Sequence, residues 1–209
     1  MPAPRVLVLY SPSSYRGAAF LDAASRLGYD AVPGIDLPTE LADHWGVSLS
    51  LDFTDPAAAV ERITALHADA PFDAVLAVDD RATLIAATAA DSLGLAHNDP
   101  ASALAARDKW VMRQRFAAAD VPVPRFTRYP LYADPVPIAE SEHYPCVVKP
   151  LRLSGSRGVI RADTPQEFLA AWNRTRAIIE QEGIDPEAAA ILVEEYLPGV
   201  EVAVEALLT

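Results

Sequence analysis

The sequence predicts an α/β fold built in two successive parts. Short runs of Val, Leu and Ile alternate with Ala-rich segments of helical periodicity, a pattern typical of strands joined by helices. Hydrophobic residues make up 51% of the 209 residues and charged residues 22%, as in a packed globular interior. After about residue 98, proline and small-residue turns interrupt the alternation. We therefore expect a doubly wound parallel sheet in residues 1–98, followed by a part built differently.

The first part begins with a buried strand over residues 5–10 and a helix over 16–27 that ends at Gly28. A later helix is expected to have Asp55 as its N-cap and Pro56 at its first position. The remaining expected elements are strands over 31–35, 47–51 and 73–78, and helices over 56–68 and 80–93.

The second part is expected to start with one helix over 101–119, which the proline-rich segment after it ends. Residues 130–145 predict a connector with a short helix, and Thr164 with Pro165 predicts a helix start. The expected strands are 125–129, 144–150, a return strand from Val159, 190–196 and 201–208, and the helix from Pro165 reaches about Glu182.

Composition excludes several classes of function. With 29 acidic and 17 basic residues, the net charge of −12 provides no basis for binding nucleic acid or an anionic membrane. The longest uncharged apolar stretch, 82–90, is about half of the ~20 residues that a membrane-spanning helix needs. The chain enters its first strand without a signal peptide, so we expect a cytoplasmic protein. Cys146 is the only cysteine, which excludes an internal disulfide and a cysteine-based zinc cluster.

The usual phosphate-binding and metal-binding motifs are missing. The turn over residues 11–17 contains one glycine where a dinucleotide fold has three, and the sequence has no P-loop motif. The four histidines lack the spacing of a metal site. We assign no metal ligand.

Lysine is rare in this chain. The 17 basic residues include only two lysines, Lys109 and Lys149, and a lysine kept among arginines suggests a position that needs a compact ammonium group. Lys149 ends a strand and precedes a turn of small residues, namely Ser154, Gly155, Ser156, Arg157 and Gly158. A fixed ammonium group beside backbone N–H groups suits a triphosphate, and Arg157 can add positive charge. The alternatives are accidental surface lysines and an ordinary hairpin turn.

Glutamates in the last two expected strands are the other candidates. Side chains alternate along a strand, so Glu194 and Glu195 face opposite ways, and only one is solvated if one face is covered. One of these carboxylates could bind adenine. Glu201 and Glu205 would share a face, roughly 13 Å apart, and could bind ribose hydroxyls or a cation. A solvated strand face is the alternative for each.

Taken in order, four segments resemble the ATP-grasp superfamily, and the resemblance covers essentially the whole chain. The segments are Asp108-Lys109, 145–150, 154–159 and 193–201. The resemblance implies a pre-ATP-grasp domain over 1–98, a helical linker over 99–126, the ATP-grasp lid subdomain over 127–197 and the first strand of the next part over 198–209. The stretch from Val78 to Arg113 is most similar to carboxylate–amine ligases of the L-amino-acid-ligase type.

The resemblance also implies roles for residues. Lys109 and Lys149 would contact the phosphates of ATP, and residues 154–158 would close over them. Glu194 would accept a hydrogen bond from the adenine amino group, the backbone of Glu195 and Leu197 would face the adenine edge, and Glu201 would hold the ribose. Magnesium would bridge the phosphates while ATP activates a carboxylate as an acylphosphate, which an amine then attacks.

Members of this superfamily continue past the point that corresponds to Thr209. The resemblance places the magnesium-binding side chains and the catalytic residues there, so we expect a piece of a longer enzyme that is inactive alone. It implies small carboxylate and amine substrates, such as amino acids, and leaves a homodimer open. A non-catalytic nucleotide-binding or scaffold module is the main alternative, and a small-molecule-binding α/β domain without ATP is another.

Overall fold

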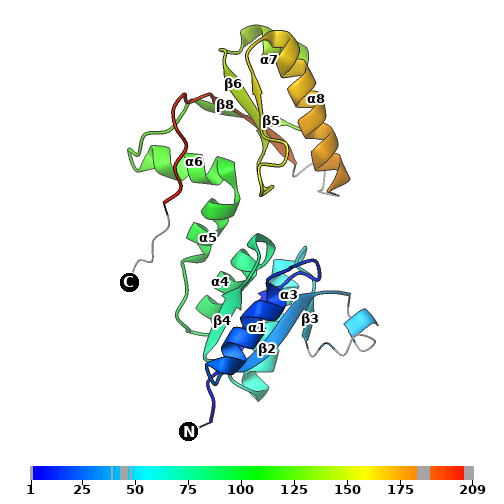
Figure 1. The fold of residues 1–209 in the computed structure, drawn as a ribbon, viewed down its shortest axis with the longest axis vertical. Coiled ribbons are helices and arrows are strands. Elements are labelled where there is room, and N and C mark those ends of the chain that lie inside the picture. The colour runs from blue at the N-terminus through cyan, green and yellow to red at the C-terminus, as the bar shows by residue number, and fades with distance from the viewer. Residues whose placement is uncertain (1, 39, 43–46, 48, 183–188, 205–209) are drawn as a thin grey trace. The chain divides into compact units, whose positions relative to one another are not determined.

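The computed structural model describes residues 2–38, 40–42, 47, 49–182 and 189–204. Its chain divides into two compact units, Met1–Arg107 and Asp108–Thr209, which we describe one at a time. Figure 1 shows the elements of each unit along the chain. No helix in the described part of the chain is both long and apolar enough to cross a bilayer.

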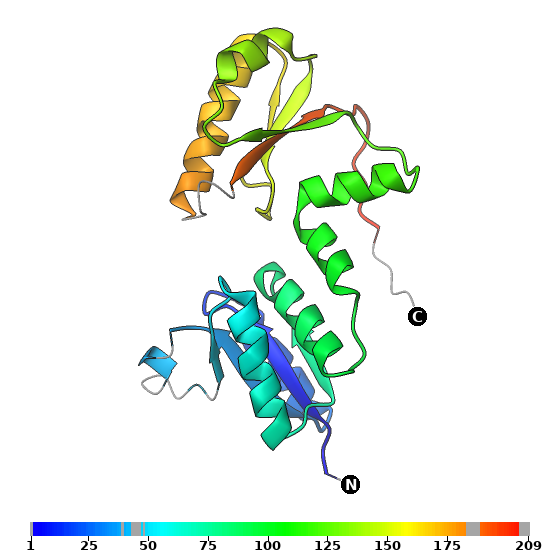
Figure 2. The same cartoon turned by 180° about the vertical axis from the view of Figure 1, so that it is seen from behind.

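The first unit contains a parallel sheet with the strand order β3-β2-β1-β4. Its strands are β1 (Arg5–Tyr10), β2 (Asp30–Asp36), β3 (Leu49–Leu51) and β4 (Ala74–Ala77). Its helices are α1 (Gly17–Arg26), α3 (Pro56–Asp69), the short 3₁₀ helix η1 (Asp80–Ala82), α4 (Thr83–Ser92) and α5 (Pro100–Arg107). Helix α1 covers one face of the sheet and α3 and α4 cover the other (Figures 1 and 2). The predicted doubly wound parallel sheet is confirmed.

Apolar side chains from both strands and helices fill the core of the first unit. Leu7, Leu9, Ile63 and Ile85 are completely buried there. The predicted cap of α3 is also present, because the Asp55 carboxylate accepts a hydrogen bond from Ala58 N–H.

The second unit is built on an antiparallel sheet with the strand order β5-β8-β6-β7. Its strands are β5 (Phe126–Pro130), β6 (Cys146–Pro150), β7 (Ile160–Ala162) and β8 (Ala190–Glu195). Its helices are α6 (Lys109–Ala118), α7 (Pro135–Ser141) and α8 (Pro165–Gln181). Alternate residues of β8 belong to different clusters: Ile191 and Val193 pack with residues of α7 and α8, whereas Leu192 packs with Leu151 and Trp110 of α6. Helix α6 therefore packs on the opposite face of the sheet.

The prediction of a single helix over 101–119 is wrong, because two helices, α5 and α6, occupy this segment. The backbone of Asp108 is extended, with φ −105° and ψ 109°, and it separates α5 from α6. The Asp108 carboxylate caps α6 by accepting hydrogen bonds from Trp110 N–H at 3.0 Å and Val111 N–H at 3.3 Å. Helix α5 packs against α4, so the first unit extends to Arg107.

The last expected strand is not formed where the structure can test it. Residues 201–204 lie outside any helix or strand, and residues 205–208 lie outside the described residues. Val200, Val202 and Val204 are 92%, 77% and 86% exposed. A strand needs a neighbour to pair with its backbone groups, and within the described ranges none pairs with this segment.

Candidate functional site

Three elements of the second unit bring charged side chains to one face of its sheet. Lys149 lies near the end of β6, Glu194 near the end of β8, and Lys109 and Arg113 lie one turn apart on α6. Val147 of β6 pairs with Glu194 and Lys149 pairs with Leu192, so Lys149 and Glu194 are diagonal neighbours across the two strands.

Glu194 is the centre of this cluster. It is only 4% exposed, and its carboxylate accepts hydrogen bonds from two cationic side chains. Arg113 donates from Nε to Oε1 at 2.7 Å and from Nη2 to Oε2 at 3.3 Å. Lys149 Nζ donates to Oε2. The carboxylate therefore has one charged partner on helix α6 and another on strand β6.

These partners keep Glu194 ionised. Burial alone raises its pKa, but the hydrogen bonds and positive charges of Arg113 and Lys149 outweigh burial. The pKa of Glu194 consequently lies below its ordinary value of 4.5. At neutral pH Glu194 and the two side chains that pair with it carry one negative and two positive charges.

The lowered pKa predicts how stability depends on pH. A carboxyl group whose pKa is lower in the folded state stabilises the fold above its unfolded pKa, and this contribution is lost as pH falls through the folded pKa. We expect Glu194→Gln to lower the free energy of unfolding by about 1–3 kcal/mol near pH 7, and by progressively less toward about pH 3. Urea unfolding across this range measures the difference.

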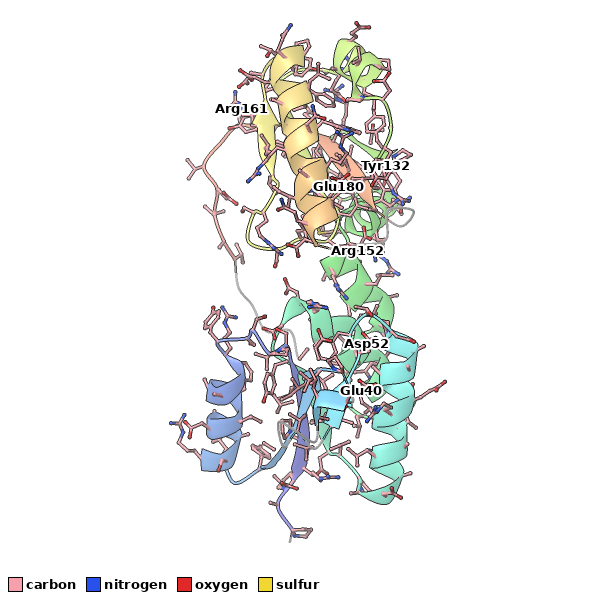
Figure 3. All side chains as sticks on the ribbon, turned by 90° about the vertical axis from the view of Figure 1, so that its right-hand side faces the viewer. Glu40, Asp52, Tyr132, Arg152, Arg161 and Glu180 are labelled. Atoms are coloured by element: carbon pink, nitrogen blue, oxygen red, sulfur yellow. The ribbon has the colours of Figure 1, made fainter. Side chains whose placement is uncertain are left out.

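The matched control is Glu180→Gln, a change at an exposed position of α8 that Figure 3 labels. It should cost little, since surface substitutions usually change stability by less than about 0.5 kcal/mol. An effect of Glu194→Gln that stays constant with pH would contradict the charge pairing.

Lys109 holds the beginning of the turn after β6. Its Nζ donates to the carbonyl oxygens of Leu153 at 2.8 Å and Leu151 at 3.3 Å, and its backbone N–H donates to Leu151 O at 3.1 Å. Beside it, Arg152 Nε donates to the buried Asp108 carboxylate at 2.8 Å, and Figure 3 labels Arg152 next to α6. The start of α6 and the start of the turn are therefore joined by several hydrogen bonds.

The turn itself is anchored at its ends and exposed at its tip. Leu151 and Leu153 are buried, whereas residues 154–157 are exposed. Gly155 and Ser156 both have left-handed backbones, with φ +64° and +56°. Among the described residues, and apart from Gly155 and its two chain neighbours, no atom lies within 4 Å of where a Cβ of Gly155 would be. At the far end, Thr175 of α8 donates its hydroxyl to Gly158 O at 3.0 Å.

The guanidinium group of Arg157, which the sequence suggested for phosphates, is paired with Glu182. Its Nη1 donates to Glu182 Oε1 at 2.5 Å, and its Nη2 donates to Oε2 at 3.4 Å. The sequence could not reveal this pairing, because Glu182 follows only after the whole of helix α8.

The side chain of Glu195 faces away from the cluster, as strand alternation predicts. Its carboxylate accepts from the backbone N–H of Arg125 at 3.3 Å and from Nε at 3.4 Å, and these contacts, led by the backbone hydrogen bond, lower its pKa. With His143 and Thr127, it lines an open cavity of about 560 Å³ on this other face. Its own N–H donates to Arg125 O at 2.9 Å, so it is already engaged within the sheet.

Leu197 and Glu201 follow β8 and are both exposed. Among the described residues, no contact joins Glu201 to Lys109, Lys149 or Glu194. The structure therefore pairs Lys149 with Glu194 and joins Lys109 to the start of the turn, whereas no hydrogen bond or ion pair joins Glu201 to these residues in the part of the chain that is described.

Two contributors were not predicted from the sequence. Arg113 was given no role, although it lies one helical turn after Lys109 and therefore on the same side of α6. The pairing of Arg152 with Asp108 was also missed, although an aspartate before a helical segment is a recognisable N-cap signal.

Both units match known protein families. Residues 21–97 match the ATP-grasp N-terminal domain, and residues 142–209 match the ATP-grasp domain. The chain belongs to the ATP-grasp superfamily, which confirms the family and the fold class predicted from the sequence.

Named relatives come from both sequence and structure. D-alanine–D-alanine ligase from Thermotoga maritima is 31% identical over 121 residues, which are 57% of this chain and 35% of that protein. The crystal structure of an L-amino acid ligase from Bacillus licheniformis superposes with a TM-score of 0.64 and 20% identity, over 95% of this chain and 45% of that one.

A second similar structure contains a nucleotide. The biotin carboxylase domain of the Hydrogenobacter thermophilus 2-oxoglutarate carboxylase, in complex with MgADP and bicarbonate, gives a TM-score of 0.61 at 16% identity, over 94% of this chain and 45% of that one. The chain thus spans less than half the length of these two structures, and the likeness to them shows a shared fold.

Proposed function

We propose that this chain binds ATP through its second unit, as the nucleotide-binding part of a ligase that activates a carboxylate as an acylphosphate for attack by an amine. The observation that carries the proposal is that Lys149 pairs with the buried Glu194 while Lys109 binds the start of the exposed turn that follows β6. Membership of the ATP-grasp superfamily supports it.

The residues present fit a triphosphate. Two ammonium groups, from β6 and α6, flank the beginning of the turn, and left-handed residues at its tip allow a close approach of the backbone. Lys149 and Lys109 would hold phosphate oxygens, and residues 154–158 would cover them. Bound ATP supplies the phosphoryl group.

The adenine would lie near the end of β8. Glu194 Oε1 accepts one hydrogen bond, from Arg113, and a carboxylate oxygen can accept a second from the adenine amino group. Because Glu195 N–H is engaged by Arg125, the remaining backbone groups for the adenine edge are the carbonyl of Glu195 and the N–H of Leu197. Glu201 would have to move toward the other residues to bind the ribose.

The substrates we propose are small carboxylates and amines, amino acids among them. The names of two relatives, a D-alanine–D-alanine ligase and an L-amino acid ligase, favour this class. Within the described residues, no three His, Cys, Asp or Glu side chains gather as a metal site. Magnesium would therefore be held through the phosphates and by residues outside the described ones.

Calorimetric titration of this chain with Mg-ATP tests the proposal, with Mg-GTP as the matched control. We expect one ATP to bind in the micromolar range and GTP to bind at least about tenfold more weakly, because guanine has no amino group at the position that Glu194 would bind. Absence of ATP binding by a folded chain would contradict the proposal.

Turnover separates a ligase from a module that only binds nucleotide. We would measure phosphate release from Mg-ATP with and without mixed amino acids, using this chain and any longer protein that contains it. Amino-acid-dependent release supports the ligase, whereas binding without release in the longer protein supports the non-catalytic alternative.

A further inference from the structure

The ion cluster around Glu194 contains more positive than negative charge. One buried carboxylate is shared by Arg113 and Lys149, whose side chains are only 19% and 12% exposed. Among the described residues, these are the charged groups that the structure places on Glu194, one from α6 and one from β6. A single cation would already neutralise this carboxylate, so the second one needs a reason.

The two cations are bound differently. The guanidinium of Arg113 reaches both carboxylate oxygens, a forked geometry that fixes orientation as well as charge. The ammonium group of Lys149 contacts Oε2 alone and ends a long flexible side chain. Lys149 is therefore the partner that can leave with less disturbance.

Moving Lys149 away from Glu194 costs free energy, and Arg113 lowers this cost. A buried carboxylate without a cationic partner is strongly unfavourable, so a Glu194 paired with Lys149 alone would hold that lysine tightly. With Arg113 in place, Glu194 keeps a charged and hydrogen-bonded partner when Lys149 turns to another anion.

We propose that Arg113 is a positioning residue of the phosphate site, which retains Glu194 so that Lys149 can transfer its Nζ from Glu194 to a phosphate oxygen of the nucleotide. The inference rests on the proposed ATP site and assigns a role to a residue of α6 that does not touch the phosphates itself. The ATP affinity should therefore depend on the charge at position 113, and this dependence should require the Glu194 carboxylate.

Calorimetric titration of Mg-ATP into five variants tests this role. Arg113→Gln should weaken binding by about tenfold, because Lys149 becomes the only cation on Glu194. Arg113→Lys keeps the charge and should stay within about threefold of the parent chain. Arg115→Gln, an exposed position on the same helix, is the matched control and should bind as the parent does. Glu194→Gln alone measures the cost of changing the proposed adenine contact. Adding Arg113→Gln to Glu194→Gln should cost little further affinity, because a neutral amide no longer retains Lys149.

A second measurement needs no nucleotide. Carbon-13 NMR of the Glu194 carboxyl group should show its pKa rise in Arg113→Gln and remain low in Arg113→Lys, with thermal unfolding checking that each variant is folded. This titration shows, without ATP, whether Arg113 lowers the pKa of Glu194.

The outcomes separate this inference from the proposed function. Equal ATP affinity in Arg113→Gln and the parent overturns the positioning role while the ATP site stands. The same holds if Arg113→Gln weakens binding as much in the Glu194→Gln background as in the parent, since the effect would then not pass through Glu194. If the folded parent binds no ATP, the proposed function and the transfer of Lys149 are both overturned, whatever the NMR titration shows.

Discussion

Replacing Lys149 with alanine will weaken Mg-ATP binding by about a hundredfold, while the chain stays folded. An ammonium group bound to a phosphate contributes about 1.5–3 kcal/mol, and its removal leaves the site without one of its two lysines. The fold persists because Arg113 still pairs with the buried Glu194 carboxylate. Calorimetric titration and thermal unfolding of the same sample measure the two effects.

Arg161→Ala is the matched control, because Arg161 lies on the adjacent strand β7, where it pairs with Asp163 at the surface. It should leave ATP affinity unchanged. The pairing of Lys149 with Glu194 predicts a small loss of stability as well. Unchanged ATP affinity in the Lys149 variant would contradict the assignment of the site.

Trp172→Ala should be the most destabilising single change considered, costing about 3–5 kcal/mol. Trp172 is completely buried between α8 and the antiparallel sheet, with its ring centroid 5.8 Å from that of Phe168 and 5.9 Å from that of Tyr129. Its removal leaves a cavity in the second core. Urea unfolding followed by circular dichroism measures the loss.

Trp172→Phe distinguishes lost volume from lost polarity. In the part of the chain that the structure describes, the indole Nε1 of Trp172 has no hydrogen-bond partner, so phenylalanine forfeits no hydrogen bond. We expect it to cost only about 1–2 kcal/mol. If both variants lost the same stability, packing volume would not be the cause.

Local patterns in the sequence predicted much of this architecture. The cap of α3 at Asp55, the strand that carries Lys149 and the opposite orientations of Glu194 and Glu195 all follow from short-range rules. The sequence does not readily predict the helix break at Asp108, because helical residues lie on both sides of it. The one local signal for the break is Asp108 itself, as the N-cap of α6. Local periodicity does not show where one helix ends and another begins without a turn between them.

Partners distant in sequence were beyond such rules. Arg113 and Glu194 are separated by most of the second unit, and only the packing of α6 against the sheet brings them together. Arg157 was likewise treated as a charge for a ligand, although its partner Glu182 lies at the end of α8. The neighbours of a charged residue in the sequence therefore do not predict its ion-pair partner, which depends on the tertiary fold.

The division at Asp108 has a consequence for how such a protein can diverge. Arg113, Lys149, Glu194 and the turn after β6 all belong to the second unit, which has its own sheet and its own core. Substitutions in the first unit leave every contact of this cluster in place. Selection can therefore change the first unit while the hydrogen bonds around Glu194 are inherited unaltered.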